Sequence, residues 1–219
     1  ALSWKNPTLT FDVNVKGTIH LLEGIRELRL SPRILLVGSS EQARAANPYA
    51  VSKMTQEMLG KLYGSAYSMG IVMVRAYNHT GPRQKPEFVI PDFSRRIALM
   101  EKGKMEPLLK VGNLDAVRDF SDVRDIVRAY YELITKGRAG EVYNVGSGKG
   151  YSIRELLDRL LSLSTLSIEV KPDPERMRPS EIAVSICDNS KIYEDTGWKP
   201  EIDIQKTLQD VLDYWRQEA

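Results

Sequence analysis

The chain has 219 residues, of which 42% are hydrophobic and 27% charged, and its net charge of +2 excludes both a basic field for nucleic acid and an acidic tail. The single Cys187 excludes an internal disulfide and fits a reducing compartment, and it lies far in sequence from His20 and His79, so no metal site is expected. No apolar run approaches the roughly 20 residues that span a bilayer and no secretory signal opens the chain, so we expect a cytoplasmic protein without a membrane partner.

Helices and strands are predicted to alternate along the chain. Apolar residues at three- to four-residue spacing indicate amphipathic helices, and short apolar runs indicate buried strands. Helices are expected at residues 8–29, 49–68, 91–102, 122–136, 152–163, 189–196 and 204–216. Strands are expected at residues 34–37, 71–74, 108–111, 141–145 and 168–170. Strand, helix and strand in this order predict βαβ units, and therefore an α/β fold with a parallel sheet.

The first candidate site follows the strand predicted at residues 34–37. This run reads as a strand buried on both faces, with Ser39 and Glu41 at its carboxyl end, where ligands bind in open α/β sheets. Tyr49 then begins a helix, and Lys53 lies one turn further along the same face. An ammonium there favours the tyrosinate and lowers the pKa of the phenol from about 10. Such a phenol can exchange a proton with a sugar or alcohol hydroxyl, and the serine can hydrogen-bond the same oxygen.

A structural alternative exists for each of these polar residues. Only Tyr49 of the ten tyrosines has a lysine four residues later, which is close to what composition alone produces. The pair could therefore be an exposed pair worth a few tenths of a kcal/mol at a helix start. Its position after a buried strand that ends in Gly-Ser-Ser favours the catalytic interpretation. In the helix before it, Asn14 is either an exposed or helix-bonded amide, or an anchor for a water or a lysine.

Polar loops at later strand ends supply candidate ligands. Asn78 and Arg83 follow the strand at residues 71–74 and could meet a phosphate or a sugar hydroxyl, although the Gly-Pro between them could form only a turn. The guanidinium of Arg118 suits bidentate phosphate recognition, or alternatively it caps a nearby aspartate. The small residues at 146–148 lack a phosphate-loop spacing and predict a turn.

Seven segments together resemble the extended short-chain dehydrogenase/reductase family, the epimerases, dehydratases and reductases of nucleotide sugars. They are VNVKGT, GSSE, NPYAVSK, RAYNHTGPRQ, VRDFSDVRDIVRAY, EVYNVGSG and TGWKP. Within the family, the GNLDAVRDF and RPSE segments resemble enzymes of GDP-mannose metabolism. The resemblance implies a Rossmann-type doubly wound parallel sheet with a smaller C-terminal α/β substrate-binding region.

The resemblance also implies roles for individual residues. Tyr49 would be the acid/base group at the sugar C4 oxygen, Lys53 would orient the cofactor ribose and lower the tyrosine pKa, and Ser39 would hydrogen-bond the reacting oxygen. Glu41 matches a carboxylate that the dehydratases use and that reductases can keep. Contacts with the cofactor, NADP or NAD, are implied for Tyr49, Lys53, Tyr77 and His79. Contacts with a GDP-sugar substrate are implied for Ser40, Asn78, Arg83, Val89, Asn113, Arg118, Arg178 and Glu181.

The resemblance also implies a division into two domains, and the sequence differs from the family pattern in two places. Residues 1–78 would be the C-terminal part of the dinucleotide-binding domain with the catalytic Ser/Tyr/Lys set, and residues 79–219 mainly the nucleotide-sugar-binding region, with about 108–147 returning to the main sheet. The family's opening strands and Gly-rich pyrophosphate loop have no counterpart in the sequence. The segment between Glu41 and Pro48 is also about a dozen residues shorter than usual. We therefore expect the intact protein to be about a third larger.

The expected function is NAD(P)-dependent reduction of the C4 keto group of a GDP-4-keto-6-deoxyhexose, in deoxysugar biosynthesis. A GDP-mannose 4,6-dehydratase is the main alternative, with Glu41 assisting the loss of water, and a nucleotide-sugar 4-epimerase is a third. A non-catalytic nucleotide-sugar-binding remnant is favoured only by the missing cofactor half. Family members commonly form dimers through the two helices that flank the active-site strand, so a homodimer is expected, with Met54, Met58 and Ile19 suited to that packing.

Overall fold

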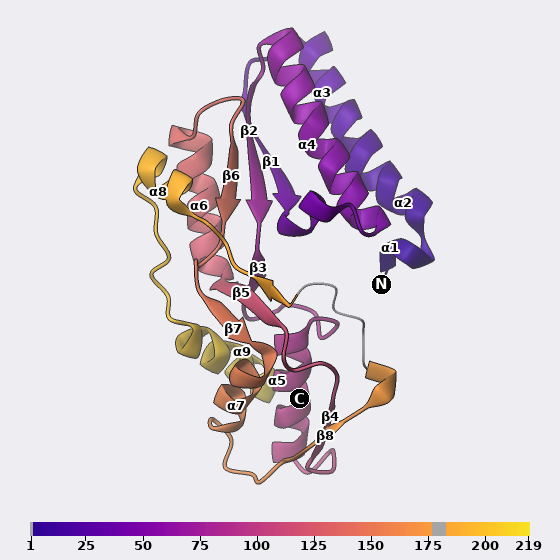
Figure 1. Cartoon of the computed structure of the whole chain (residues 1–219), viewed down its shortest axis with the longest axis vertical. Coiled ribbons are helices and arrows are strands. Elements are labelled where there is room, and N and C mark those ends of the chain that lie inside the picture. The colour runs from indigo at the N-terminus through magenta and orange to yellow at the C-terminus, as the bar shows by residue number, and fades with distance from the viewer. Residues whose placement is uncertain (1, 177–182) are drawn as a thin grey trace. The chain divides into compact units, whose positions relative to one another are not determined.

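The computed structural model describes residues 2–176 and 183–219 of the chain (Figure 1). The chain divides into two compact units, each assembled from three segments that are separate in the sequence. The first unit contains Ala1–Tyr77, Val127–Val145 and Asp188–Lys199. The second unit contains Asn78–Ile126, Gly146–Cys187 and Pro200–Ala219.

A parallel sheet with the strand order β1-β2-β6 forms the centre of the first unit. Its strands are β1 (Arg33–Ser39), β2 (Gly70–Ala76) and β6 (Val142–Val145). The helices of this unit are α1 (Leu2–Lys5), α2 (Pro7–Phe11), α3 (Gly17–Glu27), α4 (Pro48–Tyr67), α8 (Ser190–Thr196) and most of α6 (Val123–Lys136). Helix α4 packs on β1 and β2, and α3 lies beside α4 (Figure 1).

The position of a strand in this sheet determines how far it is buried. In the central strand β2, the four residues 71–74 are each at most 1% exposed, as predicted for a strand that is covered on both faces. In β1, an edge strand of the described sheet, Ile34 and Leu36 are buried but Leu35 and Val37 are only half-buried. The prediction that this strand is buried on both faces is therefore wrong. Only the face that packs with Leu22 of α3 is closed.

The helix predicted at residues 8–29 is interrupted. Asn6 caps α2 by accepting a hydrogen bond from the backbone N–H of Leu9 at 3.0 Å, with a proline in the first turn. Asp12–Lys16 then form a π-helical turn, and α3 continues from there. Such wide turns are frequent at functional sites. A pattern of apolar residues does not reveal a single wide turn, because it changes the helical period only locally.

The second unit combines short strands with three longer helices. The helices are α5 (Val89–Glu101), α7 (Ile153–Leu161) and α9 (Ile204–Glu218). The strands are β3 (Asn78–Thr80), β4 (Leu108–Val111), β5 (Val117–Asp122), β7 (Gly150–Ser152), β8 (Glu169–Pro172) and β9 (Val184–Ser185). Strand β5 pairs in parallel with β3 and β9 and antiparallel with β7, while β4 pairs in parallel with β8. Ile97, Leu156 and Leu208, each at most 1% exposed, bring one residue from each helix into the core.

Apart from the interruption of the helix predicted at residues 8–29, each helix and strand predicted from an apolar pattern is confirmed, with small differences at the ends. The strands that were not predicted, β3, β5, β7 and β9, are short or polar and carry no apolar run. Within residues 2–176 and 183–219, no helix is both long enough and apolar enough to cross a membrane. Over the same ranges, no three His, Cys, Asp or Glu side chains gather in a way that could hold a metal ion.

Candidate active site

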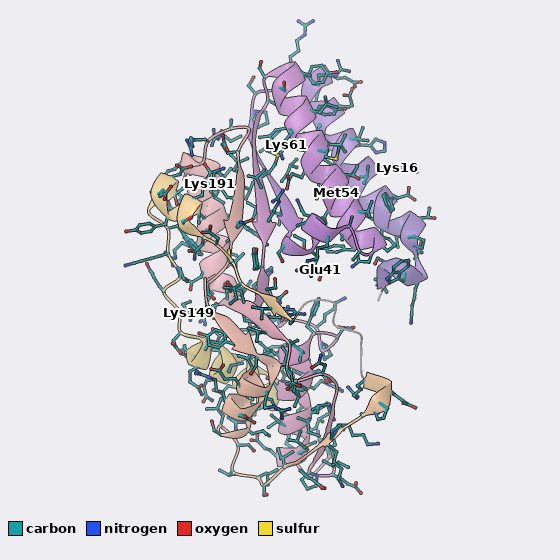
Figure 2. All side chains as sticks on the ribbon, in the orientation of Figure 1. Lys16, Glu41, Met54, Lys61, Lys149 and Lys191 are labelled. Atoms are coloured by element: carbon teal, nitrogen blue, oxygen red, sulfur yellow. The ribbon has the colours of Figure 1, made fainter. Side chains whose placement is uncertain are left out.

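The tip of β1 is shaped by Gly38 and by a reciprocal cap. A Cβ at Gly38 would lie 2.7 Å from a carbonyl oxygen of β2 and would collide with the side-chain oxygen of Gln42. Ser39 caps the 3₁₀ turn Ser40–Arg44, and its hydroxyl accepts a hydrogen bond from the N–H of Glu41 at 3.2 Å. In return, Gln42 Oε1 accepts from the N–H of Ser39 at 3.0 Å. Figure 2 shows Glu41 on this turn, at the carboxyl end of the strand.

A buried carboxylate holds the strand-tip turn in place. Gln42 is 1% exposed, and its Nε2 donates to the carboxylate of Glu57. Arg75 donates to both carboxylate oxygens of Glu57 at 2.8 Å, and Lys61 donates to one at 2.9 Å. Burial by itself raises the pKa of Glu57, but the hydrogen bonds and charges of Arg75 and Lys61 outweigh it and keep the pKa below 4.5. The turn that carries Ser39 is thus held in place through Gln42 by the ionised carboxylate of Glu57 and its two cationic partners.

Tyr49 lies in the first turn of α4, next to Ser39. Asn47 caps the helix by accepting a hydrogen bond from a backbone N–H at 2.9 Å. The Tyr49 phenol is half-buried, and the Ser39 side chain lies close enough to it to affect its pKa. Burial raises the pKa of Tyr49; the polar side chain of Ser39 offsets part of this rise, and the charge of Glu41 adds to it. The phenol therefore carries its proton at neutral pH and can donate it.

Lys53 follows Tyr49 by one turn, but it is engaged elsewhere. Its ammonium donates to the carbonyl oxygen of Val37 at 2.9 Å and to Gln56 Oε1 at 3.0 Å. Burial lowers the pKa of Lys53. The prediction that Lys53 lowers the pKa of Tyr49 is wrong for this structure, because burial of the phenol has the largest effect on its pKa. The Lys53 ammonium donates its described hydrogen bonds to the oxygens of Val37 and Gln56 instead.

Asn14, in the π-helical turn, connects the opening helices to the start of α4. Its Nδ2 donates to Ser52 Oγ at 2.9 Å, and the Ser52 hydroxyl donates to the carbonyl oxygen of Tyr49 at 2.8 Å. The carbonyl oxygen of Asn14 accepts from the Thr18 hydroxyl at 2.7 Å. The interpretation of Asn14 as an exposed amide is therefore wrong, and its side chain anchors the helix that carries Tyr49.

The other predicted site residues are distributed as follows. Ser40 and Tyr77 belong to the first unit, in the 3₁₀ turn and directly after β2. The second unit contains Asn78, His79, Arg83, Val89, Asn113 and Arg118. Arg178 and Glu181 lie outside the residues that the structure describes.

Two predicted ligands in the second unit share a pocket of about 260 Å³. His79 and Arg83 line it together with Val123 and the intervening loop. The N–H of Gln84 donates to the carbonyl oxygen of Gly81 at 3.3 Å, so this loop turns, as the Gly-Pro pair predicts. Arg83 adopts a φ of +71°, a left-handed conformation that favours glycine.

Arg118 and its neighbour Asp119 have different tasks. Arg118 donates to the carbonyl oxygens of Val117 at 2.7 Å and Ala183 at 3.4 Å. Asp119 is fully buried and accepts from the N–H and hydroxyl of Ser147 at 2.8 Å and 2.6 Å. It also accepts from the N–H of Gly148 at 2.8 Å and of Cys187 at 3.1 Å. This carboxylate therefore organises the small-residue turn after β6.

Comparisons with known proteins agree on one family. A family model described as "GDP-mannose 4,6 dehydratase" matches residues 1–211. The GDP-6-deoxy-D-mannose reductase of Pseudomonas aeruginosa is 36% identical over 97% of this chain and 75% of its own length. The GDP-mannose 4,6-dehydratase of Vibrio cholerae is 27% identical over 97% of this chain and 68% of its own length. The chain belongs to the extended short-chain dehydrogenase/reductase family, the NAD-dependent epimerases and dehydratases.

Solved structures of this family share the fold. The structure of RMD from Pseudomonas aeruginosa complexed with NADPH matches with a TM-score of 0.93 and 34% identity, over 99% of this chain and 77% of that one. The Thermus thermophilus UDP-glucose 4-epimerase in complex with NAD matches with a TM-score of 0.83 and 27% identity, over 100% of this chain and 74% of that one. The chain is thus a Rossmann-type member of a family that modifies nucleotide sugars.

The residues present fit one part of the NAD(P) that these family members bind. An ammonium has three donors, and Lys53 uses two of them in its described contacts, which leaves one N–H for a ribose hydroxyl. Tyr49 lies one turn away, at the carboxyl end of β1, where this fold binds nucleotides. The Gly-rich turn that holds a pyrophosphate has no counterpart in the 219 residues.

Several residues whose hydrogen bonds support the candidate site were not recognised as such from the sequence alone, although one of them could have been. The cap between Ser39 and Gln42 could have been found, because a serine followed three residues later by a glutamine is a capping-box pattern. Glu57, Gln56 and Thr18 carry no such local signal. Their partners lie on other elements or further along the helix, and only the folded chain brings them together.

Proposed function

We propose that the protein reduces the C4 keto group of a GDP-4-keto-6-deoxyhexose with hydride from NADPH or NADH. The observation that carries the proposal is the half-buried Tyr49 phenol beside Ser39 at the carboxyl end of β1, with Lys53 one turn further along α4. The 36% identity to GDP-6-deoxy-D-mannose reductase supports the choice of substrate.

Each of these three residues has a separate part in the reduction. A bound nicotinamide cofactor supplies the hydride for C4. Tyr49 donates its proton to the C4 oxygen, so that the ketone becomes a secondary alcohol. Ser39 donates a hydrogen bond to the same oxygen and holds the carbonyl in line with the phenol. Lys53 binds the nicotinamide ribose through its remaining N–H and keeps it next to Tyr49.

The second unit supplies the contacts with the nucleotide in this proposal. Asn78 and Arg118 bind the diphosphate, as a side-chain amide and a guanidinium can. Arg83 contributes a further positive charge beside the pocket that it shares with His79. Val89, at the start of α5, and Asn113 lie near the guanine. Ser40 of the first unit contacts the sugar.

A GDP-mannose 4,6-dehydratase is the second candidate. Glu41 favours it, because this exposed carboxylate lies near enough to Tyr49 to raise the pKa of the phenol. Removal of water from the sugar requires a group that takes a proton from C5, and a carboxylate beside the acid/base tyrosine is suited to that step. The description of the matching family model supports the same reaction.

One pair of incubations separates the two reactions. The intact natural protein that contains this chain is given either GDP-mannose with catalytic NADP or NAD, or the GDP-4-keto-6-deoxy sugar with NADPH or NADH. We expect stoichiometric oxidation of the reduced cofactor with the keto sugar and no consumption of GDP-mannose. Conversion of GDP-mannose without net oxidation of cofactor would refute the reductase and establish the dehydratase.

We also propose a homodimer that forms through α3 and α4. Met58 and Leu62 lie one turn apart on α4 and are 62% and 60% exposed, so their apolar surface is available to a second copy. Substituting Met58→Glu should convert the dimer to a monomer in light scattering. Gln209→Glu, on α9, is a control that should leave the mass unchanged. A monomeric wild-type protein would contradict the proposal.

A further inference from the structure

A continuous chain of hydrogen bonds leads away from the ammonium of Lys53. Lys53 Nζ donates to Gln56 Oε1 at 3.0 Å, and Gln56 Nε2 donates to Thr18 Oγ1 at 2.9 Å. The Thr18 hydroxyl donates to the carbonyl oxygen of Asn14 at 2.7 Å. Two side chains, Gln56 of α4 and Thr18 of α3, therefore connect the lysine to the π-helical turn without a break.

The direction of every bond in this chain is determined by its first member. A lysine ammonium can only donate, so the side-chain oxygen of Gln56 must face it and the amide nitrogen must face Thr18. Thr18 then accepts through its oxygen, and its single proton is left for the carbonyl of Asn14. Hydrogen bonds that are aligned in this way polarise one another and strengthen the chain. The arrangement thus has only one consistent orientation, which suits a device that holds a group in place.

We propose that Gln56 is a positioning residue that, supported by Thr18, fixes the ammonium of Lys53 for its contact with the nicotinamide ribose. The proposal rests on the proposed reductase function for its catalytic consequence, but the geometry of the chain does not depend on that function. Gln56 connects the lysine to a neighbouring helix, while the other described contact of the ammonium is with Val37 of the sheet.

The side-chain amide of Gln56 is one of two described acceptors that hold the buried ammonium of Lys53. Thr18 is 5% exposed, so the residue at the far end of this row of hydrogen bonds is buried. Burial of the ammonium lowers the pKa of Lys53. Glu57, on the same helix, is committed to Arg75 and Lys61. The titratable phenol of Tyr49 is the other nearby group on α4. Dipoles of Gln56 and of Val37 thus stabilise a cation that has no carboxylate partner among the described residues.

Substitutions at Gln56 test the proposal through the lysine itself. Protein labelled with ¹³C at the lysine Cε is titrated by NMR without substrate or cofactor, and the Lys53 signal is assigned with Lys53→Arg. We expect Gln56→Leu to lower the midpoint of Lys53, because the ammonium loses an acceptor, and Gln56→Glu to raise it, because the acceptor becomes an anion. The control Gln209→Leu, on α9, should leave the midpoint unchanged.

Substitutions at Thr18 give a second test that avoids a change next to the lysine. Thr18→Val has nearly the same shape but lacks the hydroxyl, and it should move the Lys53 midpoint in the same direction as Gln56→Leu. Thr18→Ser keeps the hydroxyl and should restore the wild-type midpoint. If Gln56→Leu does not fold, the Thr18 pair and Gln56→Glu decide the question. A Lys53 midpoint that is the same in wild type, Gln56→Glu and Thr18→Val overturns the proposal.

The catalytic consequence is measured separately on the intact protein. Gln56→Leu should lower kcat with the keto sugar by about tenfold and raise KM for the cofactor, because a lysine that is displaced by even 1 Å no longer aligns the ribose. Gln209→Leu should change neither constant. A shifted Lys53 midpoint with no activity toward the keto sugar in wild type would refute the reductase function and leave the positioning role standing. If the wild-type enzyme is active but the Lys53 midpoint does not shift in the variants, the positioning role is refuted and the reductase function stands.

Discussion

Replacing Glu57 by glutamine should loosen the turn that carries Ser39 without creating a cavity. The carboxylate is 8% exposed, and each of its described partners, Arg75, Lys61 and Gln42, is a donor. A glutamine amide presents an NH₂ group to one of these donors, so at least one hydrogen bond becomes a clash between donors. Because Gln42 is 1% exposed, water cannot replace the partner that it loses.

The expected loss of stability is about 2–3 kcal/mol. An unsatisfied buried donor costs roughly 1–3 kcal/mol, and breaking a fully buried ion pair costs about 3–5 kcal/mol. The second figure has to be reduced, since the side chains of Arg75 and Lys61 are 35% and 52% exposed and water can solvate them. For a chain of this length, the melting temperature should fall by roughly 5–10 °C.

Urea unfolding of wild type and Glu57→Gln at neutral pH measures this difference. The pKa of Glu57 lies below 4.5 in the folded protein, so the stabilisation by its charge is complete above this pH and is lost as the pH falls through the folded pKa. The gap between the two proteins should therefore narrow in acid. Lys61→Ala, which removes the most exposed partner, is the control and should cost less than about 1 kcal/mol. A Glu57→Gln effect below about 0.5 kcal/mol would refute the reasoning.

Three further predictions concern the phenol, the second unit and a strained turn. Glu41→Gln should lower the pKa of Tyr49, because it removes a negative charge that raises this pKa, and the titration of ¹³Cζ-labelled tyrosine would show an unchanged midpoint if this is wrong. Asp119→Asn should lower the free energy of unfolding in urea by about 2–3 kcal/mol, since the buried carboxylate accepts from four N–H and O–H donors and an amide cannot accept from all of them. The control is Asp115→Asn, which should cost almost nothing because the Asp115 side chain is 84% exposed. Arg83→Gly should raise the melting temperature, by relieving a φ of +71° worth about 1 kcal/mol, while it weakens substrate binding; a lower melting temperature would contradict the strain.

The fold could be predicted from the sequence wherever apolar residues repeat. Strand β2 and helix α4 have regular patterns, and both were found within three residues of their ends. Strands β3 and β5 escaped because their residues are largely polar, and their pairing joins segments about 40 residues apart. The π-helical turn at Asp12–Lys16 escaped because one wide turn leaves the surrounding periodicity intact.

The sequence identified the residues of the candidate site but not the direction in which the pKa of Tyr49 is shifted. Ser39, Tyr49 and Lys53 were found from their spacing and from the family resemblance, and the structure brings the side chains of Ser39 and Tyr49 close together. The direction of the tyrosine pKa was wrong because burial is a property of the folded chain and cannot be read from a spacing of four residues. The contacts of Gln56 were missed because its partner Thr18 lies 38 residues away in the sequence.

The most direct test of the account is to follow the hydride into the product. The intact protein is given the GDP-4-keto-6-deoxy sugar and NADPH or NADH that carries deuterium at the transferred position, and the product is analysed by mass spectrometry and NMR. The account predicts a GDP-6-deoxyhexose with one deuterium at C4, and no such product from Tyr49→Phe. Product without deuterium at C4, or full turnover by Tyr49→Phe, would contradict it.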